Sequence, residues 1–478
     1  MLFNSLQYAF FLPIVFGLYW LVPHKQRWIV VLLSSYYFYM SWNAKYLLLI
    51  MFITGVSYVG ALLVEREKKQ KRKKLWVGSV VVVSLTLLFV FKYFNFVSGL
   101  VTELLNMASI PTSGIVLSLL LPVGISFYTF QAIGYTIDVY RGDVSAEHHI
   151  GRYAAFVSFF PQLVAGPIER TRNLLPQLKE ERFFDYGQAT YGLKLMAWGY
   201  FKKIVIADTL AAYVDKIYAD MHFFSGFARL VVIFFFSIQI YCDFSGYSDI
   251  ARGTAKLFGV ELMENFKSPY FSTSVREFWR RWHISLSTWF RDYVYIPLGG
   301  NRVSRLRNAV NIMITFLLSG LWHGASLTFV AWGGLHGGCQ VVEKQVEFHK
   351  KEGKHKIPYA VKVVFNFLII SALWVFFRAQ SFKDAAYMLV YWYQGLNNPV
   401  RWIVGGFGNL GIGAVTAVKL LLMILLLAVF DYISLKKDVI DCIGKWKLPC
   451  RWSVYIGLVV LVFLWAPAES AEFIYFDF

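Results

Sequence analysis

The stretch NIMITFLLSGLWHGASLTFVAW, at residues 311–332, contains no Asp, Glu, Lys or Arg. A helix needs about 20 apolar residues to cross the hydrocarbon core of a bilayer, so this stretch predicts helices inside a membrane. Its one ionisable side chain is His323. We expect His323 to be functional, because an ionisable group is costly at membrane depth; a hydrogen-bonded structural histidine is the alternative. The flanking Gly320 and Gly324 predict room beside the ring for a ligand or a close backbone. His336, in WGGLHGGC, is expected to be structural.

The whole chain has the composition of a membrane protein. Hydrophobic residues make up 57% and charged residues 16% of its 478 residues, against roughly 45–50% and 25% in soluble globular proteins. We therefore predict an all-α polytopic membrane protein with a single domain over residues 1–478. About eleven spans are expected, near residues 3–22, 28–42, 46–64, 75–93, 114–138, 228–242, 309–322, 325–342, 358–377, 412–430 and 453–467. Proline or lysine interrupts two further apolar stretches, 152–167 and 187–210, which predicts re-entrant or tilted helices.

The positive charges lie in short runs between the apolar stretches. The formal net charge is +18, but the basic residues do not gather on a soluble face, so no nucleic-acid partner is predicted. The basic loops 65–74, 343–356 and 436–451 are expected on the cytoplasmic side of the cell membrane. Counting spans from these loops places the N-terminus and the tail 468–478 on the extracytoplasmic side, with the first apolar stretch kept as a span. The four cysteines form no C-x-x-C motif, so neither a disulfide framework nor a metal site is expected.

The segment 270–308 is too polar to be a simple span. It contains seven arginines and only two acidic residues. On a helical period the aromatic residues of one broad face are Phe278, Trp282, Trp289 and Tyr293. The opposite face contains Arg276, Arg280, Arg281 and Arg291. This pattern predicts an amphipathic helix on the cytoplasmic side. It either holds anionic lipid at the interface or lies in the mouth of a cavity, where its arginines bind an anionic donor, and the two roles are compatible.

Polar residues also follow the apolar run IFFFSIQI. The motif YCDFSGYSD at 241–249 contains Asp243, Ser245 and Asp249. These side chains are expected to cap a helix start or to form an ion pair with an arginine of 276–291. A bound cation is the less favoured alternative.

Five motifs resemble the membrane-bound O-acyltransferase family, and they follow one another along essentially the whole chain. They are LPVGISFYTFQAIGYTIDVYRG at 121–142, FFPQLVAGPIER at 159–170, YCDFSGYSD at 241–249, REFWRRWHISLSTWFRDYVYIPLGGNR at 276–302 and SGLWHGA at 319–325. The bacterial alginate O-acetylation and peptidoglycan O-acetyltransferase membrane proteins are the most similar subgroup. The resemblance implies re-entrant and amphipathic helices, besides the spans, around a central funnel or tunnel.

The resemblance also implies roles for particular residues. His323 matches the family's invariant histidine, and His283 matches its second polar position. Imidazole, with an unperturbed pKa of about 6.5, suits a general base that takes the proton of an attacking hydroxyl. We expect His323 to be this base and His283 or Trp282 to stabilise the oxyanion. The residues expected to bind the phosphates of the donor are Arg280, Arg281 and Arg291, with Trp282 beside them.

The predicted activity is that of an O-acyltransferase with no tightly bound cofactor. It moves an acyl group, expected to be acetyl, from a cytoplasmic thioester donor across the membrane for O-acetylation of an extracellular or cell-wall polysaccharide. The donor is acetyl-CoA or an acyl carrier thioester, and the expected partner is an extracytoplasmic esterase-like transferase. The alternatives are D-alanyl transfer to teichoic acids from a carrier protein and, in another class, a secondary transporter or flippase. Repeats of the kind found in transporters are not seen in the sequence.

The C-terminal hexapeptide FIYFDF contains one hydroxyl, that of Tyr475. Similar tails in the family imply that this tyrosine receives the acyl group and presents it to the external partner. Composition alone favours an aromatic anchor at the membrane interface.

Overall fold

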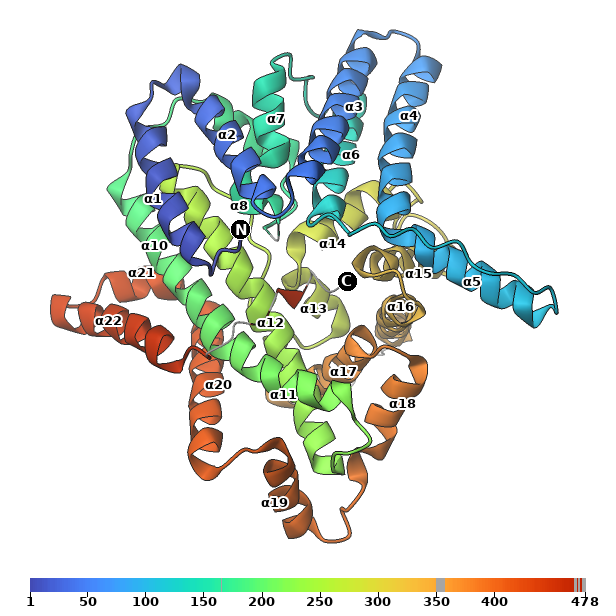
Figure 1. The fold of residues 1–478 in the computed structure, drawn as a ribbon, viewed down its shortest axis with the longest axis vertical. Helices are drawn as coiled ribbons and strands as arrows, with labels where there is room; N and C mark the ends of the chain where they lie inside the picture. Colours follow the sequence, from blue (N-terminus) through green and yellow to red (C-terminus); the bar gives the residue numbers. More distant parts are fainter. Residues whose placement is uncertain (165, 350–356, 468–470, 472, 475–478) are drawn as a thin grey trace. The chain divides into compact units, whose positions relative to one another are not determined.

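The protein is described here by a computed structural model that covers residues 1–164, 166–349, 357–467, 471, 473 and 474 (Figure 1). Regular secondary structure in these ranges is entirely helical, which confirms the all-α prediction. The chain divides into two compact units. The first contains Met1–Met196 and Ile250–Met263, and the second contains Ala197–Asp249 and Glu264–Phe478.

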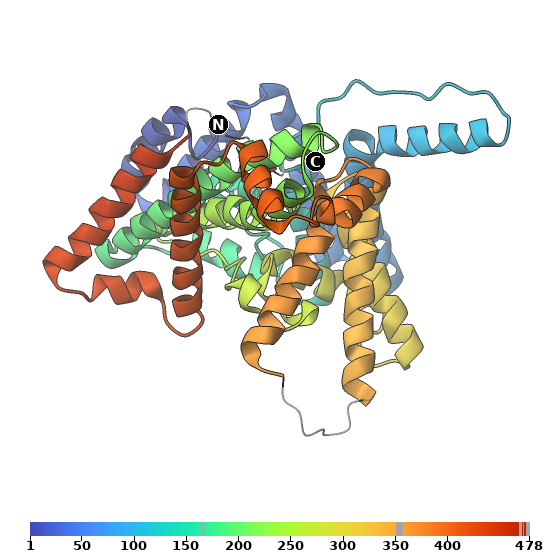
Figure 2. The same cartoon turned by 90° about the horizontal axis from the view of Figure 1, so that it is seen from below.

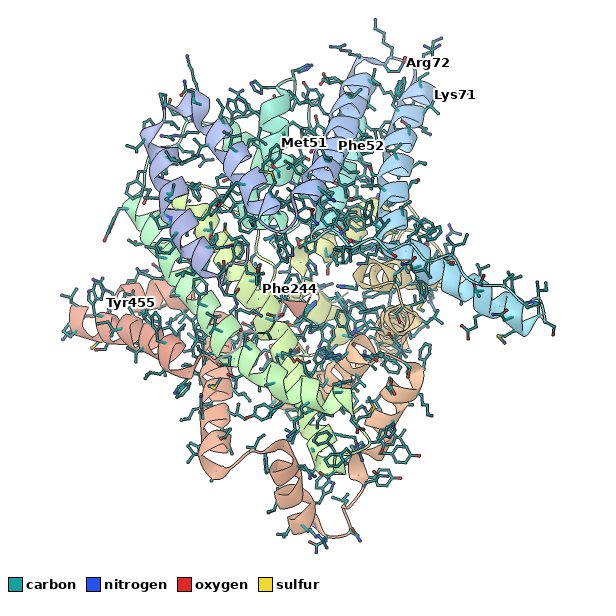
Figure 3. The ribbon with its side chains drawn as sticks, viewed as in Figure 1. Met51, Phe52, Lys71, Arg72, Phe244 and Tyr455 are labelled. Atoms are coloured by element: carbon teal, nitrogen blue, oxygen red, sulfur yellow. The ribbon has the colours of Figure 1, made fainter. Side chains whose placement is uncertain are left out.

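The first unit is built around helix α3. Its helices are α1 (Leu6–Leu21), α2 (Arg27–Met40), α3 (Leu47–Arg66), α4 (Gln70–Leu88), α5 (Phe94–Met107), α6 (Ile125–Arg141), α7 (Ile150–Ser158), α8 (Phe160–Leu163), α9 (Thr171–Lys179) and most of α10 (Tyr186–Tyr200). Helix α3 packs against α4, α6 and α7. The hydroxyl of Ser57 on α3 forms a buried hydrogen bond of 2.7 Å with that of Tyr153 on α7. Lys71 and Arg72 lie at the start of α4 (Figure 3), within the predicted basic loop.

The predicted span 114–138 is wrong in its first half. Helix α6 begins only at Ile125. Pro122 and the left-handed backbone of Gly124, with φ of 73°, interrupt the helix that the apolar composition predicted. The chain before them returns alongside α5 (Figure 2), where the Asn95 side chain bonds both backbone groups of Leu117.

The second unit contains the polar motifs that the sequence singled out. Its helices are α11 (Asp208–Ala219), most of α12 (Gly226–Leu257), α13 (Val275–Arg281), α14 (Ile284–Phe290), α15 (Arg305–His323), α16 (Leu327–His349), α17 (Tyr359–Arg378), α18 (Phe382–Val390), α19 (Pro399–Leu410), α20 (Ala414–Ser434), α21 (Val439–Gly444) and α22 (Leu448–Trp465). Helices α13, α15 and α17 all pack against α16.

Six helical segments of the described residues are long and apolar enough to cross a membrane. They are Ala44–Arg66, Gln70–Met107, Gly226–Leu257, Tyr359–Arg378, Ala414–Ser434 and Leu448–Trp465. Most of the other predicted spans coincide with helices that are shorter or more polar, such as α1, α2 and α15. The protein is therefore a multi-pass membrane protein, and the number of crossings stays a prediction.

Candidate active site

His323 and His283 lie together in the second unit. Their ring centroids are 6.3 Å apart. His323 is the last residue of α15 and is 2% exposed, whereas His283 lies between α13 and α14 and is 0% exposed. Burial lowers the pKa of His283 to about 3, because desolvation disfavours the imidazolium. His283 is therefore neutral at physiological pH.

Aromatic rings surround both histidines. The ring of His323 packs edge-to-face at 5.0 Å from Trp322 and at 5.0 Å from Trp332. The ring of Phe377 lies 5.4 Å from it. His283 meets Phe244 of α12 at 4.6 Å and 87° (Figure 3). A cation that forms on His323 would gain from these ring faces and from the negative end of the α15 dipole.

Gly320 and Gly324 do not leave open space beside His323, in contrast to the prediction. A Cβ atom on Gly320 would lie 2.2 Å from the carbonyl oxygen of Phe329, and one on Gly324 would lie 2.2 Å from the ring of Phe329. Gly333 on α16 likewise faces the carbonyl oxygen of Phe316 on α15 at 2.2 Å. The glycines therefore permit close contact between α15 and α16, which is a packing role.

The predicted amphipathic helix over 270–308 is broken at His283. Helix α13 ends at Arg281 and α14 starts at Ile284, while His283 has a left-handed backbone with φ of 43°. Asn265 holds the start of α14 in place: its carbonyl accepts the N–H of Ile284 at 3.0 Å and its side-chain oxygen accepts that of Ser285 at 3.1 Å. At this break the side chain of His283 points into the interior. A continuous helix with the same aromatic and basic residues could not place it there.

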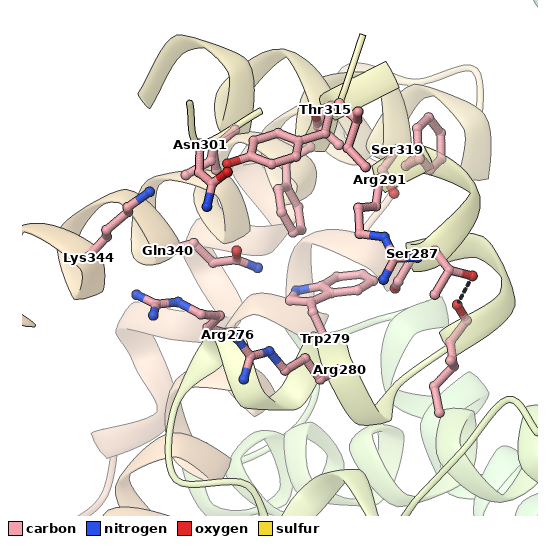
Figure 4. Close-up of a pocket in the computed structure, with 17 residues that line it drawn as sticks. Arg276, Trp279, Arg280, Ser287, Arg291, Asn301, Thr315, Ser319, Gln340 and Lys344 are labelled. Carbon is pink, nitrogen blue, oxygen red and sulfur yellow. Dashed lines mark hydrogen bonds between the residues drawn. The ribbon is translucent and has the colours of Figure 1, made fainter. Parts of the chain in front are cut away.

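A pocket of about 730 Å³ lies in the second unit, and neither His283 nor His323 is among its lining residues (Figure 4). Four of its lining side chains are cationic, namely Arg276, Arg280, Arg291 and Lys344, and no lining residue is acidic. The pocket also reaches Ser319, one helical turn before His323, and Ile284, next to His283. Positively charged side chains and residues close in sequence to both histidines therefore line the same pocket.

The cationic groups reach the pocket from α13, from α16 and from the π-helical segment Arg291–Tyr295 that follows α14. Arg276 and Arg280 are one turn apart on α13, and Gln340 and Lys344 are one turn apart on α16. The carboxylate of Glu343 accepts the N–H groups of Val275 and Arg276 at 2.6 and 3.0 Å, which fixes the start of α13 against α16. Sequence analysis did not assign Lys344 to the site, because it read the basic run 343–356 only as a topology signal.

The predicted donor-binding residues do not all line this pocket. Arg280 and Arg291 do, with the Nε of Arg291 paired to Asp292 at 2.7 Å. Arg281 instead pairs with Glu277 at 2.6 Å, and Trp282 is buried among aromatic rings that include Trp374 at 5.0 Å. Trp279, which sequence analysis did not single out, lines the pocket and donates its indole N–H to Nδ1 of the buried His336 at 3.1 Å. His336 thus has a hydrogen-bonding role.

Asp243, Ser245 and Asp249 lie inside α12, so they do not cap a helix start as the sequence suggested. The two aspartates form ion pairs with lysines that the sequence did not suggest as partners. Lys203 lies 2.7 Å from Asp243, and Lys202 lies 2.7 Å from Asp249 and donates a hydrogen bond of 2.9 Å to Ser245. These pairs allow α12 to continue to Leu257, beyond the predicted end at residue 242.

Tyr475 lies outside the described residues.

Known proteins resemble this chain over most of its length. The profile of the membrane-bound O-acyltransferase family matches residues 144–381. The probable alginate O-acetylase AlgI of Pseudomonas aeruginosa is 39% identical over 90% of this chain and 81% of its own length. The peptidoglycan O-acetyltransferase of Helicobacter pylori is 35% identical over 81% of this chain and 79% of its own. The teichoic acid D-alanyltransferase of Streptococcus thermophilus is 31% identical over 48% of this chain and 58% of its own. With its apolar, all-helical fold, the chain therefore belongs to the membrane-bound O-acyltransferase family and is an O-acyltransferase.

Proposed function

We propose that this enzyme takes an acetyl group from a cytoplasmic thioester donor and delivers it outward for O-acetylation of a polysaccharide. The observation that carries this proposal is the buried pair His283 and His323, together with a pocket that is lined by the residue after His283, by a residue one turn before His323 and by four cationic side chains, with no acidic one. The relatives named as alginate and peptidoglycan O-acetylating proteins, which match most of the chain, support acetyl as the group and polysaccharide as the final acceptor.

The two histidines support a direct transfer to a hydroxyl. The hydroxyl oxygen attacks the thioester carbonyl carbon while His323 takes its proton as general base. The tetrahedral intermediate then expels the thiolate, which takes the proton from the imidazolium, so that an ester and a free thiol result. The developing oxyanion needs a donor. The indole N–H of Trp282, next to His283, makes no hydrogen bond to the described residues and is available for this purpose.

The cationic pocket supports an anionic donor. Arginine side chains bind phosphate oxygens with paired N–H donors, and Arg276 and Arg280 extend on the same side of Trp279 in Figure 4. Coenzyme A carries several phosphates, whereas the phosphopantetheine arm of a carrier protein carries one. Four cations around one pocket therefore favour acetyl-CoA over a carrier. The basic loops support a cytoplasmic position for the donor side, with both termini outside.

The proposal is tested with purified enzyme and two labelled donors, acetyl-CoA and a D-alanyl carrier protein. We expect the enzyme to release free coenzyme A and to pass labelled acetyl to an acceptor hydroxyl, with no turnover of the D-alanyl carrier. If only the D-alanyl carrier protein is turned over, the proposed activity is D-alanyl transfer and not acetyl transfer. Transport of either compound into vesicles without thioester cleavage would move the protein to the transporter class.

Arg280 and Arg281 provide a matched pair of variants for the donor site. Arg280→Gln is expected to raise the apparent KM for acetyl-CoA about tenfold at low salt, since a charge-assisted hydrogen bond is lost. Arg281→Gln is expected to change it less than about twofold, because this side chain pairs with Glu277 at the protein surface. Donor titration at low and high ionic strength measures both, and the difference between them should shrink with added salt. If Arg280→Gln and Arg281→Gln change the apparent KM for acetyl-CoA equally, both arginines are assigned to lipid anchoring.

A further inference from the structure

The last described residues of the chain are held by two buried charged groups. Lys203 donates a hydrogen bond from Nζ to the carbonyl oxygen of Ala471 at 3.1 Å. The N–H of Ile474 donates to Oδ2 of Asp243 at 2.8 Å. Phe473, between these two backbone contacts, is 1% exposed, and Ile474 is 6% exposed. Ala471 and Ile474 are therefore bound through their backbone groups, and Phe473 and Ile474 are buried.

The charged groups that hold the tail form a cluster of their own. Lys203 lies 2.8 Å from Asp208 and 2.7 Å from Asp243, and all three side chains are at most 3% exposed. A buried charge that loses its partner is strongly destabilising, so each member of the cluster stabilises the others. Asp243 uses one oxygen for Lys203 and the other for Ile474. A carboxylate is needed for this, because an amide has only one acceptor oxygen.

The bound tail lies close to the histidine pair. The ring of Phe473 packs 4.4 Å from that of Tyr247 and 6.0 Å from that of Phe244. Phe244 in turn packs edge-to-face on His283 at 4.6 Å. A single aromatic ring therefore separates Phe473 from His283, and Tyr475 follows Ile474 directly in the sequence.

We propose that Asp243 and Lys203 are positioning residues: they bind the backbone at Ala471 and Ile474 and so limit where the next residue of the sequence, Tyr475, can place its hydroxyl. This inference rests on the proposed outward delivery of the acetyl group, with the tail tyrosine that the family resemblance implies as its acceptor. Fixing Ile474 restricts the volume that the next residue can search, which raises the effective concentration of its hydroxyl at the site. Asp243 and Lys203 bind backbone groups, so binding requires an N–H at position 474 and an aromatic ring at position 473. It does not require one particular tail sequence.

A purely structural role for the cluster is the competing explanation, and α12 offers a matched control. Asp249 lies six residues after Asp243 on the same helix and pairs with Lys202 at 2.7 Å, whereas Asp243 accepts the N–H of Ile474. Asp243→Asn and Asp249→Asn each replace one buried carboxylate by an amide. The first leaves a single acceptor oxygen where Lys203 and the N–H of Ile474 use two.

The test measures the exposure of the tail in the full-length chain. Ile474→Cys is introduced after replacement of the four native cysteines, and the rate of its reaction with a small maleimide is followed without any donor. Asp243→Asn is expected to speed this labelling about tenfold, the factor for one charge-assisted hydrogen bond, while Asp249→Asn leaves the rate unchanged. Phe473→Ala, which leaves the cluster intact, is expected to speed labelling as well. Thermal melting in detergent shows that each variant is folded.

Transfer is then measured in the chain with its native cysteines. Asp243→Asn should lower acetyl transfer at saturating acetyl-CoA and leave the apparent KM for acetyl-CoA unchanged, which a general loss of structure would not do. Equal labelling rates for Asp243→Asn and the parent, or equally faster rates for Asp243→Asn and Asp249→Asn, would overturn the binding of Ile474 by Asp243. Faster labelling with full transfer would overturn the positioning role. Because labelling needs no donor, its result stands even if Tyr475 proves not to carry the acetyl group.

Discussion

His323→Ala is expected to abolish acetyl transfer while folded protein stays in the membrane. The change removes the imidazole that is proposed as the proton acceptor, and the other histidine of the pair, His283, has its ring centroid 6.3 Å away. Loss of a general base costs about 10²–10⁴-fold in rate. The rate of coenzyme A release per folded molecule measures the effect.

The matched control is His336→Ala, which removes another fully buried imidazole from the same unit. His336 accepts the indole N–H of Trp279 at 3.1 Å, so its loss leaves a buried donor without a partner and should lower the melting temperature. Its rate per folded molecule should stay within about tenfold of the parent, because it holds no reacting proton. If instead the His323 variant keeps the parental rate, the base is elsewhere and His323 is a packing residue.

Much of the helical fold could be predicted from apolar runs alone. Helices α2 and α17 begin and end within two residues of the predicted spans 28–42 and 358–377. The predicted span 114–138 was wrong because the backbone conformation of one residue interrupts a helix that the apolar composition favours. Gly124, with φ of 73°, separates an apolar but non-helical stretch from α6, and no average over a window detects it.

The site was predictable in its residue types but not in its geometry. His283 and His323 came from motifs, and the structure brings their rings together. Helical periodicity did not predict which arginines line the pocket. The left-handed backbone of His283 breaks the helical register between Arg281 and Arg291. The ion pair between Asp243 and Lys203 could not be predicted either, because the two residues are far apart in the sequence. On charge alone, an arginine of 276–291 was an equally good partner for Asp243.

The described contacts of the tail also change how its composition is read. Aromatic residues near a terminus favour an interfacial anchor, and an anchor would leave Phe473 partly exposed. Phe473 is instead 1% exposed and packs on rings of α12. Composition gives no sign of this, because the cluster that holds the tail is distant in the sequence.

Tyr475→Phe is expected to reduce the acetyl content of the extracellular polysaccharide to background. The substitution removes one oxygen and keeps the aromatic ring, so anchoring by apolar contact is preserved. A phenol has a pKa of about 10, which makes its acetyl ester more activated than an alkyl ester. The ester can therefore pass its acetyl group downhill to a serine or sugar hydroxyl, and the acyl group crosses the membrane without the donor.

Tyr432→Phe on α20 is the matched control, since it removes the same oxygen from a tyrosine that is 57% exposed and far from the histidines in the sequence. It should leave the acetyl content unchanged. Mass spectrometry of the tail peptide provides a second measurement: with acetyl-CoA and no external acceptor, the parent should gain one acetyl group on Tyr475 and the His323→Ala variant should gain none. Parental acetylation of the polysaccharide by Tyr475→Phe, with no acetylated tail in the parent, would reject the relay. Transfer would then pass directly from the thioester to the external acceptor, and the tail would act as an anchor held by Asp243 and Lys203.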